Sequence, residues 1–543
     1  MDWAPREVEP SRARRYVRDG FWDDRSLGHV LGEGLRDAAR EPFTVRSERR
    51  PFRGTLGDVD ALARRLAGGL RARGIGPGDA VAFQLPNWAE AAATFYAACH
   101  LGAVVVPIVH FYGAKEVGHI LRRTRVRALV TADRFAHLDY LATLDGLRAE
   151  GLPDLELVAV VGGPAPGTLP FDALADADPL DAPVAVDPTA PALVAYTSGT
   201  TSEPKGVVHA HRTIGAEIRQ LGAVQATGGP EPLTGAPVGH GIGMLAALLL
   251  PVFRRRAIHL IDVWDPARVL AAMLDDGLSA GQGATFFLTS LLDHPDFDPA
   301  RHAPLMPFIG LGGAAVPIAV AERARALGIE CSRSFGSTEH PSITGSSPSD
   351  AWDQRCRTDG RPLPGAELRV VDGGGRGVAV GEPGEILSRG PDCFWGYTDA
   401  ALTVDAFDAD GWFATGDVGI LDANGALTIT DRKKDIIIRG GENVSAQEVE
   451  ELVLRLPGVA EVAVVAAPDA RLGEHACAFV RPLEGAAVPT LDDVRAHLDA
   501  AGLARQKWPE ELRVVDAFPR TPSGKVQKFV LRASLRAGAD GAA

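Results

Sequence analysis

The chain has 543 residues, which is too many for one hydrophobic core, so we expect two or more domains. Its composition, 46% apolar and 23% charged, is ordinary for a globular protein, and its net charge of −14 argues against a general surface for nucleic acid or anionic membranes. Five scattered cysteines without Cys-x-x-Cys spacing disfavour a disulfide framework and a zinc site, and they fit free thiols in a reducing compartment.

The sequence also bears on membrane attachment and export. Residues 1–20 are charged throughout and lack the apolar core of a signal peptide. The longest apolar stretch, residues 241–253, is shorter than the roughly 20 residues that span a bilayer. We therefore expect a cytoplasmic protein without a transmembrane segment.

Short apolar runs alternate with amphipathic segments from about Leu56 to Gly328. Helices are expected at residues 58–74, 88–102, 265–277 and 317–328, and strands at residues 79–85, 103–108, 126–132, 155–161 and 257–261. Apolar runs separated by helices are typical of parallel sheets that are covered by helices.

The pattern of apolar and polar residues changes twice further along the chain. After Pro364 the strands become shorter and are punctuated by glycine, and a basic run then precedes a compact α/β unit. The sequence therefore predicts an α/β protein with a large N-terminal domain of parallel-rich sheets at residues 1–430. This domain includes a β-rich subdomain at about 365–430, and a hinge at 431–435 joins it to a small α/β C-terminal domain at 436–543.

A polar loop of small residues follows the apolar run PALVAY. Four hydroxyl residues and a glycine occupy positions 197–201, and Lys205 comes shortly after them. Small side chains let backbone N–H groups approach an anion, hydroxyls add donors and a lysine adds positive charge, so the loop could hold a polyphosphate. A solvated surface loop explains the composition equally well. The spacing is not the Walker pattern, which disfavours a P-loop NTPase. The next stretch, residues 207–221, has helical spacing.

The stretch FGSTEH, residues 335–340, combines an aromatic ring, a glycine, two hydroxyls and an acid. Phe335 could stack on a base, Thr338 could donate to a phosphate oxygen and Glu339 could hold Mg²⁺. Taken alone, a turn with an exposed acid is the simpler interpretation.

Three further stretches carry charged residues of interest. Asp417 lies in a glycine-flanked turn and could accept hydrogen bonds from ribose hydroxyls. The basic run at 432–439 is either a solvated face or part of an interdomain pocket. Lys525 lies on a loop between proline and glycine residues, where it is either a surface lysine or a group that a domain motion delivers to a site.

Together and in this order, these stretches resemble the adenylate-forming (ANL) superfamily, which includes acyl-CoA synthetases, peptide-synthetase adenylation domains and luciferases. The resemblance extends from about Leu56 to Arg532 and rests on TSGTTSEPKG, FGSTE, TGD, DRKKDIIIRGGENV and PRTPSGK. Two positions depart from the common pattern, since Ser202 stands where glycine is commoner and Phe335 where tyrosine is.

The resemblance implies a role for each matching residue. The ATP phosphates would be bound by Thr197, Ser198, Gly199, Thr200, Thr201 and Lys205. The rest of the nucleotide would lie against Gly313, Ala314, Phe335, Gly336, Ser337, Asp417 and Arg432, the last two on the ribose. The catalytic residues would be Lys525, bridging the substrate carboxylate and the α-phosphate, Thr338 on the α-phosphate, Glu339 as the Mg²⁺ ligand, and His240 beside the carboxylate. The acyl pocket would include His240, Met244 and Gly312, the CoA tunnel Gly440 and Gly441, and the hinge Lys434.

The resemblance implies an ATP-dependent carboxylate–CoA ligase that uses ATP, Mg²⁺ and CoA, with no nucleic-acid partner, and it allows a homodimer. The motif sequences are most similar to those of ligases for short- and medium-chain fatty acids or alicyclic acids such as cyclohexanecarboxylate. Two alternatives stay open, namely an acyl-AMP ligase that loads a separate carrier protein and a non-catalytic nucleotide-binding relative.

Overall fold

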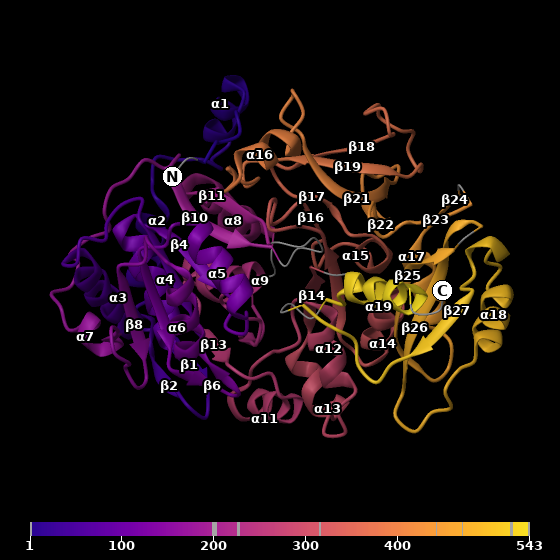
Figure 1. Ribbon diagram of the computed structural model, residues 1–543, viewed down its shortest axis with the longest axis horizontal. Helices are drawn as coiled ribbons and strands as arrows, with labels where there is room; N and C mark the ends of the chain where they lie inside the picture. Colours follow the sequence, from indigo (N-terminus) through magenta and orange to yellow (C-terminus); the bar gives the residue numbers. More distant parts are fainter. Residues whose placement is uncertain are drawn as a thin grey trace.

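In a computed structural model, the chain forms a large N-terminal part, a β-rich part along one edge and a small C-terminal part (Figure 1). The structure describes residues 3–197, 204–224, 228–313, 316–440, 442–469, 471–521 and 525–540.

The largest element of the N-terminal part is an eight-stranded sheet. In spatial order its strands are β20 (Gly396–Tyr397), β11 (Gly206–Ala210), β10 (Pro191–Tyr196), β4 (Val104–Ile108), β3 (Ala80–Gln84), β5 (Ala128–Ala132), β8 (Leu157–Val161) and β9 (Leu169–Pro170). The pairs from β10 to β9 are parallel, whereas β11 and β20 are joined in antiparallel fashion at one edge.

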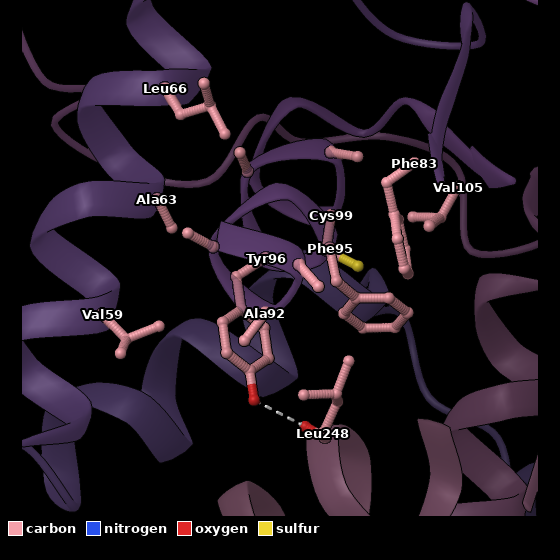
Figure 2. Close-up of a cluster of buried hydrophobic side chains, with 14 of the residues drawn as sticks. Val59, Ala63, Leu66, Phe83, Ala92, Phe95, Tyr96, Cys99, Val105 and Leu248 are labelled. Atoms are coloured by element: carbon pink, nitrogen blue, oxygen red, sulfur yellow. Dashed lines mark hydrogen bonds between the residues drawn. The ribbon is translucent and has the colours of Figure 1, made fainter. Parts of the chain in front are cut away.

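Helices cover both faces of this sheet. One face packs against α2 (Leu27–Asp37), α3 (Leu56–Arg71), α4 (Ala89–Leu101) and α7 (Phe171–Ala175), and the other against α5 (Ala114–Arg123) and α6 (Tyr140–Glu150). Figure 2 shows the first core, in which the Tyr96 hydroxyl donates to the Leu248 carbonyl at 2.9 Å. Because both faces are covered, every residue of β3, β4 and β5 is buried, which explains why the strands read as continuous apolar runs.

A smaller mixed sheet and a parallel strand pair complete the α/β part. The sheet has the order β12 (Leu233–Thr234), β13 (Ile258–Ile261), β1 (Pro42–Arg46) and β2 (Phe52–Thr55), and the pair is β14 (Phe308–Gly312) with β15 (Glu330–Ser334). The helices here are α8 (His211–Val224), α9 (Gly241–Met244), a π-helix (Leu245–Leu249), α10 (Leu250–Arg254), α11 (Pro266–Asp276), α12 (Thr285–Leu292), α13 (Pro299–His302) and α14 (Ile318–Ala326).

The β-rich part is built on an antiparallel sheet. Its strands are β18 (Glu367–Val371), β19 (Gly384–Arg389), β21 (Phe413–Leu421) and β22 (Leu427–Arg432), accompanied by β16 (Thr344–Gly345), β17 (Arg361–Pro362), α15 (Trp352–Arg357) and α16 (Ala400–Ala406). This sheet begins close to the predicted start of the β-rich subdomain, and β22 ends at Arg432, inside the segment predicted as the hinge.

The C-terminal part is a mixed sheet flanked by helices. Its strands are β23 (Ile437–Arg439), β24 (Glu442–Val444), β25 (Val459–Asp469), β26 (Gly473–Pro482) and β27 (Glu511–Val514), and its helices are α17 (Ala446–Val453), α18 (Leu491–Ala500) and α19 (Lys528–Asp540). A turn at residues 433–436 joins β22 to this sheet.

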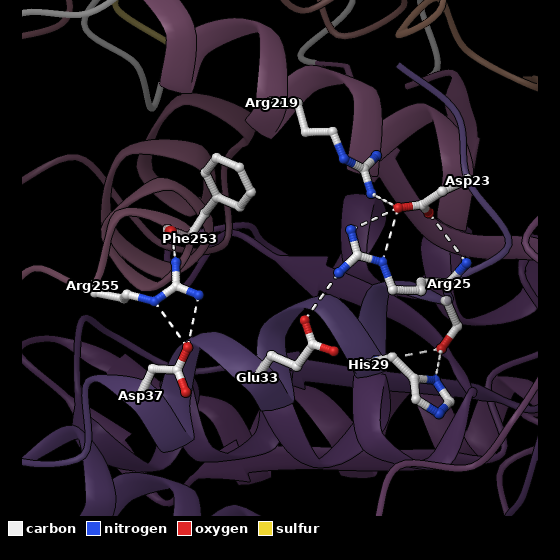
Figure 3. A network of polar contacts seen from close by, with 9 residues as sticks. Asp23, Arg25, His29, Glu33, Asp37, Arg219, Phe253 and Arg255 are labelled. Atoms are coloured by element: carbon white, nitrogen blue, oxygen red, sulfur yellow. Dashed lines mark hydrogen bonds and ion pairs between the residues drawn. The ribbon is translucent and has the colours of Figure 1, made fainter. Parts of the chain in front are cut away.

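The ordered chain begins well before Leu56, where the predicted alternation starts. Helix α1 (Pro10–Arg18) and the loop after it tie the N-terminus to later elements. Figure 3 shows Asp23 paired with both Arg25 and Arg219, the latter from α8. The Trp22 indole donates to the carbonyl of Pro391 at 2.9 Å. These contacts join the N-terminal segment to α8 and to the β-rich part.

The helical spacing predicted for residues 207–221 is only partly correct. Residues 206–210 form β11, and the helix α8 begins at His211. Val207 and Val208 pair with β10 and β20 on either side, so sheet formation overrides the local helical pattern.

Helices that combine the length and the apolar character needed to cross a bilayer do not occur in the described part of the chain.

Candidate active site

A cavity of about 1400 Å³ is lined by all three parts of the molecule. It collects most of the residues predicted to act, namely Thr197, Lys205, His240, Met244, Gly312, Gly313, Phe335, Gly336, Ser337, Thr338, Glu339, Asp417, Arg432, Lys434 and Lys525. The predictions for Ser198, Gly199, Thr200, Thr201, Ala314 and Gly441 fall outside the described residues. Residues far apart in the sequence therefore meet at one place.

The two ends of the polar loop are held together by the β10–β11 hairpin. The N–H of Thr197 donates to the Lys205 carbonyl at 3.0 Å, and the N–H of Lys205 donates to the Thr197 hydroxyl at 3.4 Å. The Lys205 ammonium lies 5.4 Å from the ring centroid of Tyr397, a cation–π contact. The lysine cation is thus directed to the cavity wall.

Glu339 has a fixed orientation in the cavity. The Tyr397 hydroxyl donates to its Oε1 at 2.8 Å, and the Glu339 carbonyl accepts the N–H of Phe394 at 2.7 Å. Burial and the Glu339 charge raise the pKa of Tyr397, so its hydroxyl keeps its proton and remains a donor. Tyr397 was not predicted as a site residue, because nothing in its local sequence signals a chemical role.

Phe335 is nearly enclosed at 7% exposure and packs against Ile343, Ile386 and Leu427. Its N–H donates to the Thr344 carbonyl at 3.1 Å, which fixes the start of the turn. Only a small part of the ring therefore reaches the cavity, which restricts the predicted stacking to its accessible part.

Asp417 and Arg432 face each other across neighbouring strands. They are direct partners in the β21–β22 register, and Arg432 Nε donates to Asp417 Oδ1 at 2.7 Å. Asp417 is 3% exposed. Burial raises the pKa of the Asp417 carboxyl, and the charge of Arg432 opposes that rise. The pair presents an acceptor and a donor side by side, which suits a diol.

Lys525 enters the cavity from the C-terminal part. The carbonyl of Lys525 accepts the N–H of Thr521 at 2.7 Å. Lys525 Cε lies about 4.0 Å from the position that a Cβ on Gly313 would take. Burial, followed by the nearby positive charge of Arg432, lowers the pKa of Lys525 to about 8. The Lys525 ammonium therefore loses its proton at a lower pH than an ordinary lysine does.

His240 is the N-cap of α9, and its Nδ1 accepts the N–H of Ile242 at 3.4 Å. Burial, with a further contribution from Lys525, lowers the pKa of His240 to about 4. The imidazole is therefore neutral at physiological pH, and the bond to Nδ1 leaves the proton on Nε2. A neutral donor is suited to orienting a carboxylate oxygen.

The predicted acyl pocket lies beside α9 and the π-helix, a kind of helical irregularity that is frequent at functional sites. Gly313 adopts φ +75°, and a Cβ there would come within 2.6 Å of Ile242 Cδ1. Trp264 and Phe286, which were not predicted from the sequence, add aromatic side chains to the cavity wall, and the guanidinium of Arg520 lies 5.6 Å from the Phe286 ring centroid. The part of the cavity wall that Ile242, Trp264 and Phe286 form is therefore mainly apolar.

Gly440 is not among the residues that line the cavity. It lies in the β23–β24 hairpin with φ +61°, and its N–H donates to the Leu472 carbonyl at 2.8 Å. The structure thus brings Lys525 to the cavity and leaves Gly440 away from it.

The C-terminal part docks through the start of α17. The Ser445 hydroxyl donates to the Thr430 carbonyl at 2.9 Å, and the N–H of Ala446 donates to Asp431 Oδ2 at 2.8 Å. Lys434 lies in the turn between the two parts, and burial followed by the charge of Arg432 lowers the pKa of Lys434 to about 8. The connection between the two parts therefore consists of residues 433–436 and carries the Lys434 ammonium close to Arg432.

Comparison with known proteins identifies the family to which the chain belongs. The AMP-binding enzyme family matches residues 36–398, and the AMP-binding enzyme C-terminal domain matches residues 448–525. A medium-chain fatty-acid–CoA ligase of Escherichia coli (strain K12) is 33% identical over 96% of this chain and 93% of its own length. A salicylyl-CoA synthase / salicylate adenylyltransferase of a Streptomyces species is 34% identical over 97% of both chains.

A third relative, from Rhodococcus jostii (strain RHA1), is a 3-[(3aS,4S,7aS)-7a-methyl-1,5-dioxo-octahydro-1H-inden-4-yl]propanoyl:CoA ligase with 39% identity over 88% of this chain and 93% of its own length. Among solved structures, the anthranilate CoA ligase AuaEII in complex with anthranoyl-AMP superposes with a TM-score of 0.86 at 26% identity, covering 95% of this chain and 98% of the other. ATP-bound MatB from Rhodopseudomonas palustris superposes with a TM-score of 0.84 at 28% identity, covering 94% and 99%. The chain therefore belongs to the AMP-binding enzyme family, within the adenylate-forming superfamily.

Proposed function

We propose that the protein is an AMP-forming carboxylate–CoA ligase. In the first half-reaction a carboxylate oxygen attacks the α-phosphorus of ATP, the bond to pyrophosphate breaks, and an acyl-AMP and pyrophosphate result. In the second, the CoA thiol loses its proton and its sulfur attacks the acyl carbon, which releases AMP and forms the thioester. The observation that carries the proposal is the meeting of Lys205, Glu339, Asp417 and Lys525 at one cavity in a chain with CoA-ligase relatives.

The charge distribution fits the first half-reaction. A carboxylate and a triphosphate repel each other, so the site has to neutralise both while the reacting atoms are held in line. Lys525 is placed to bridge the carboxylate and the α-phosphate, and Lys205 to bind the outer phosphates. Electrostatic stabilisation of this kind is worth more in a site shielded from water.

The nucleoside would be held at the β-rich edge. Asp417 would accept from the ribose hydroxyls with Arg432 beside it, and Phe335 would contact the adenine. Thr338 would donate to the α-phosphate from the same turn.

The residues present fit a magnesium ion that arrives with ATP. Mg²⁺ is commonly held by one or two carboxylates together with substrate phosphates rather than by an all-protein cage. Glu339 supplies one oriented carboxylate, and the described residues contain no group of three or more acidic, histidine or cysteine side chains that could hold a metal. When bound, the ion would neutralise phosphate charge.

For the acyl substrate we propose an apolar monocarboxylic acid of medium length or with a ring. The pocket wall includes Trp264, Phe286, Met244 and Ile242. Gly283 has φ +103°, and a Cβ on it would lie 3.8 Å from both Ile242 Cγ2 and Phe287 Cδ2. The relatives named for a medium-chain acid, salicylate and a bicyclic propanoate support an acid of this size.

We further propose that the C-terminal part alternates between two positions about Lys434. Lys525 lines the cavity, which supports assigning this arrangement to adenylate formation. A rotation would withdraw Lys525 and bring the Gly440 hairpin to the acyl-AMP, so one acyl site would serve both half-reactions.

The name of the salicylate relative, which includes an adenylyltransferase, supports one alternative, an enzyme that passes its acyl group to a separate carrier protein. The test is CoA-dependent AMP release by the purified protein with carboxylates from acetate to dodecanoate and with ring acids. AMP release with CoA supports the ligase. Acid-dependent pyrophosphate release without thioester formation supports the alternative.

Cytoplasmic location and homodimer formation are further proposals. The five cysteines are buried free thiols, which suits a reducing compartment. Light scattering after size-exclusion chromatography tests the dimer directly.

A further inference from the structure

A buried group of polar side chains lies behind the turn that carries Thr338 and Glu339. We call it the platform, and its members are each less than a tenth exposed: His209, Glu217, His340, Ser342, Ser388 and Asp392. Buried polar groups of this kind are costly unless each one has a partner. None of the roles described above uses the platform.

The platform holds the turn through its backbone. His209 Nε2 donates to the Thr338 carbonyl at 2.8 Å. The turn itself is closed by the N–H of Ser337, which donates to the His340 carbonyl at 2.9 Å. The carbonyl of Thr338 is therefore anchored from behind, while the Thr338 and Glu339 side chains remain available to the cavity.

The side chain of His340 extends the contact inward. Its Nε2 donates to Asp392 Oδ1 at 3.2 Å, and its Nδ1 lies 2.9 Å from the Ser388 hydroxyl oxygen. A Cβ on Gly390 would be 2.7 Å from His340 Nε2, so only glycine leaves room for this ring. The residue next to Glu339 is thus fixed by β19 and the loop that follows it.

Asp392 in turn contacts a second buried carboxyl group. Glu217 Oε1 accepts the Ser342 hydroxyl at 2.6 Å, and the Glu217 and Asp392 carboxyls share a hydrogen bond. The remaining oxygens, Glu217 Oε2 and Asp392 Oδ2, find no donor in the described part of the chain unless one of them carries a proton. Two touching buried carboxylates cannot both be ionised, so the pair holds one proton.

The surroundings assign that proton to Glu217. Burial, followed by the Asp392 charge, raises the pKa of Glu217 well above its usual range. Burial acts on Asp392 in the same direction, but the adjacent His340 and the hydrogen bonds that Asp392 accepts outweigh it and lower the pKa of that carboxyl. Glu217 therefore acts as a neutral donor to an ionised Asp392.

We propose that Glu217, Asp392 and His340 are positioning residues for adenylate formation, which set the turn that presents Thr338 and Glu339 to ATP. This inference rests on the proposed function. None of the three lines the cavity, so they act through the geometry of the turn in the first half-reaction. Thioester formation from acyl-AMP, which needs no pyrophosphate departure, depends on the platform much less.

Three variants test the proposal. Glu217→Gln keeps a neutral donor for Asp392 and an acceptor for Ser342, whereas Glu217→Leu has similar volume and neither. Asp392→Asn replaces an ionised acceptor with an amide and so disturbs the contact with His340. We expect kcat for adenylation, from acid-dependent pyrophosphate exchange, to stay within about threefold of wild type in Glu217→Gln and to fall about tenfold or more in the other two.

The second readout separates positioning from general damage. Thioester formation from supplied acyl-AMP should change less than threefold in all three variants, each confirmed as folded by its melting temperature. If Glu217→Leu does not fold, His209→Leu against His209→Gln makes the same comparison at the Thr338 carbonyl. Equal losses in both half-reactions, no loss in either, or a Gln variant as impaired as the Leu variant would overturn the proposal. Absence of exchange in the wild-type protein would instead contradict the proposed function.

Discussion

The hydroxyl of Tyr397 donates a 2.8 Å hydrogen bond to the carboxylate of Glu339, across the boundary between the edge strand β20 and the turn after β15. The two residues are far apart in the sequence and belong to different elements. Their contact fixes the only carboxylate that we assign to the magnesium ion.

Tyr397→Phe removes this donor and keeps the ring beneath Lys205. A hydrogen bond to a charged group is worth about 1.5–3 kcal/mol, so adenylation should slow by about 10- to 100-fold. The measurement is pyrophosphate exchange as a function of Mg²⁺ concentration, and the variant should need more Mg²⁺ than the wild type. An unchanged Mg²⁺ dependence would show that the tyrosine does not orient Glu339 for the ion.

Lys525→Ala should abolish adenylate formation and leave thioester formation from supplied acyl-AMP largely intact. The reason is that Lys525 lies in the cavity in the arrangement assigned to the first half-reaction, whereas the proposed second arrangement withdraws it. The two half-reactions are assayed separately on the same preparation. An equal loss in both would rule out domain alternation for this chain.

The pH dependence of adenylation should report Lys525. Its pKa is lowered to about 8, so the ammonium is present below that pH and is lost as the pH rises through it. Because kcat/KM reports the free enzyme, its adenylation profile should fall on the basic side with an apparent pKa near 8. His240, with its pKa lowered to about 4, stays neutral across the same range and adds no limb between pH 6 and 8. Lys525→Arg should move the basic limb to higher pH, and a limb that stays in place belongs to another group.

Gly313→Ala should raise the KM for the carboxylic acid by about tenfold or more. The residue has φ +75°, which costs an alanine about 1–2 kcal/mol, and its Cβ would meet Ile242 at 2.6 Å. Gly310→Ala is the matched control, because it lies on β14 three residues before Gly313 and its Cβ would meet no atom within 4 Å. Similar KM values in the two variants would show that the Gly313–Ile242 contact does not shape the acyl pocket.

The N-terminal segment lies outside the range matched by the family and should still contribute to stability. Trp22→Phe leaves the buried Pro391 carbonyl without its donor and should lower the free energy of unfolding by about 1–3 kcal/mol. Trp395→Phe is the control, because its indole donates to the exposed Thr189 carbonyl, which water can satisfy. The measurement is denaturant unfolding, and equal effects would contradict the structural role of Trp22.

Much of the fold was predictable because strands buried on both faces must be apolar throughout, as the runs at Ala80–Gln84 and Ala128–Ala132 are. Asp417 and Lys525 were identified because their motifs are local in sequence. Tyr397 and His209 were not, since their roles come from pairing between distant segments. The His209–Thr338 contact joins residues 129 positions apart. Pairing with β10 and β20 likewise makes residues 206–210 a strand, against the local helical pattern.

The proposed function requires that a carboxylic acid and ATP react in the cavity to give an acyl-adenylate. The most direct measurement is the exchange of radiolabelled pyrophosphate into ATP by the purified chain in the presence of medium-chain and ring acids. We expect exchange that requires both an acid and Mg²⁺ and that disappears in Lys525→Ala. Two results would contradict the proposed function: a failure of every acid in that panel to support exchange, or undiminished exchange in the Lys525 variant.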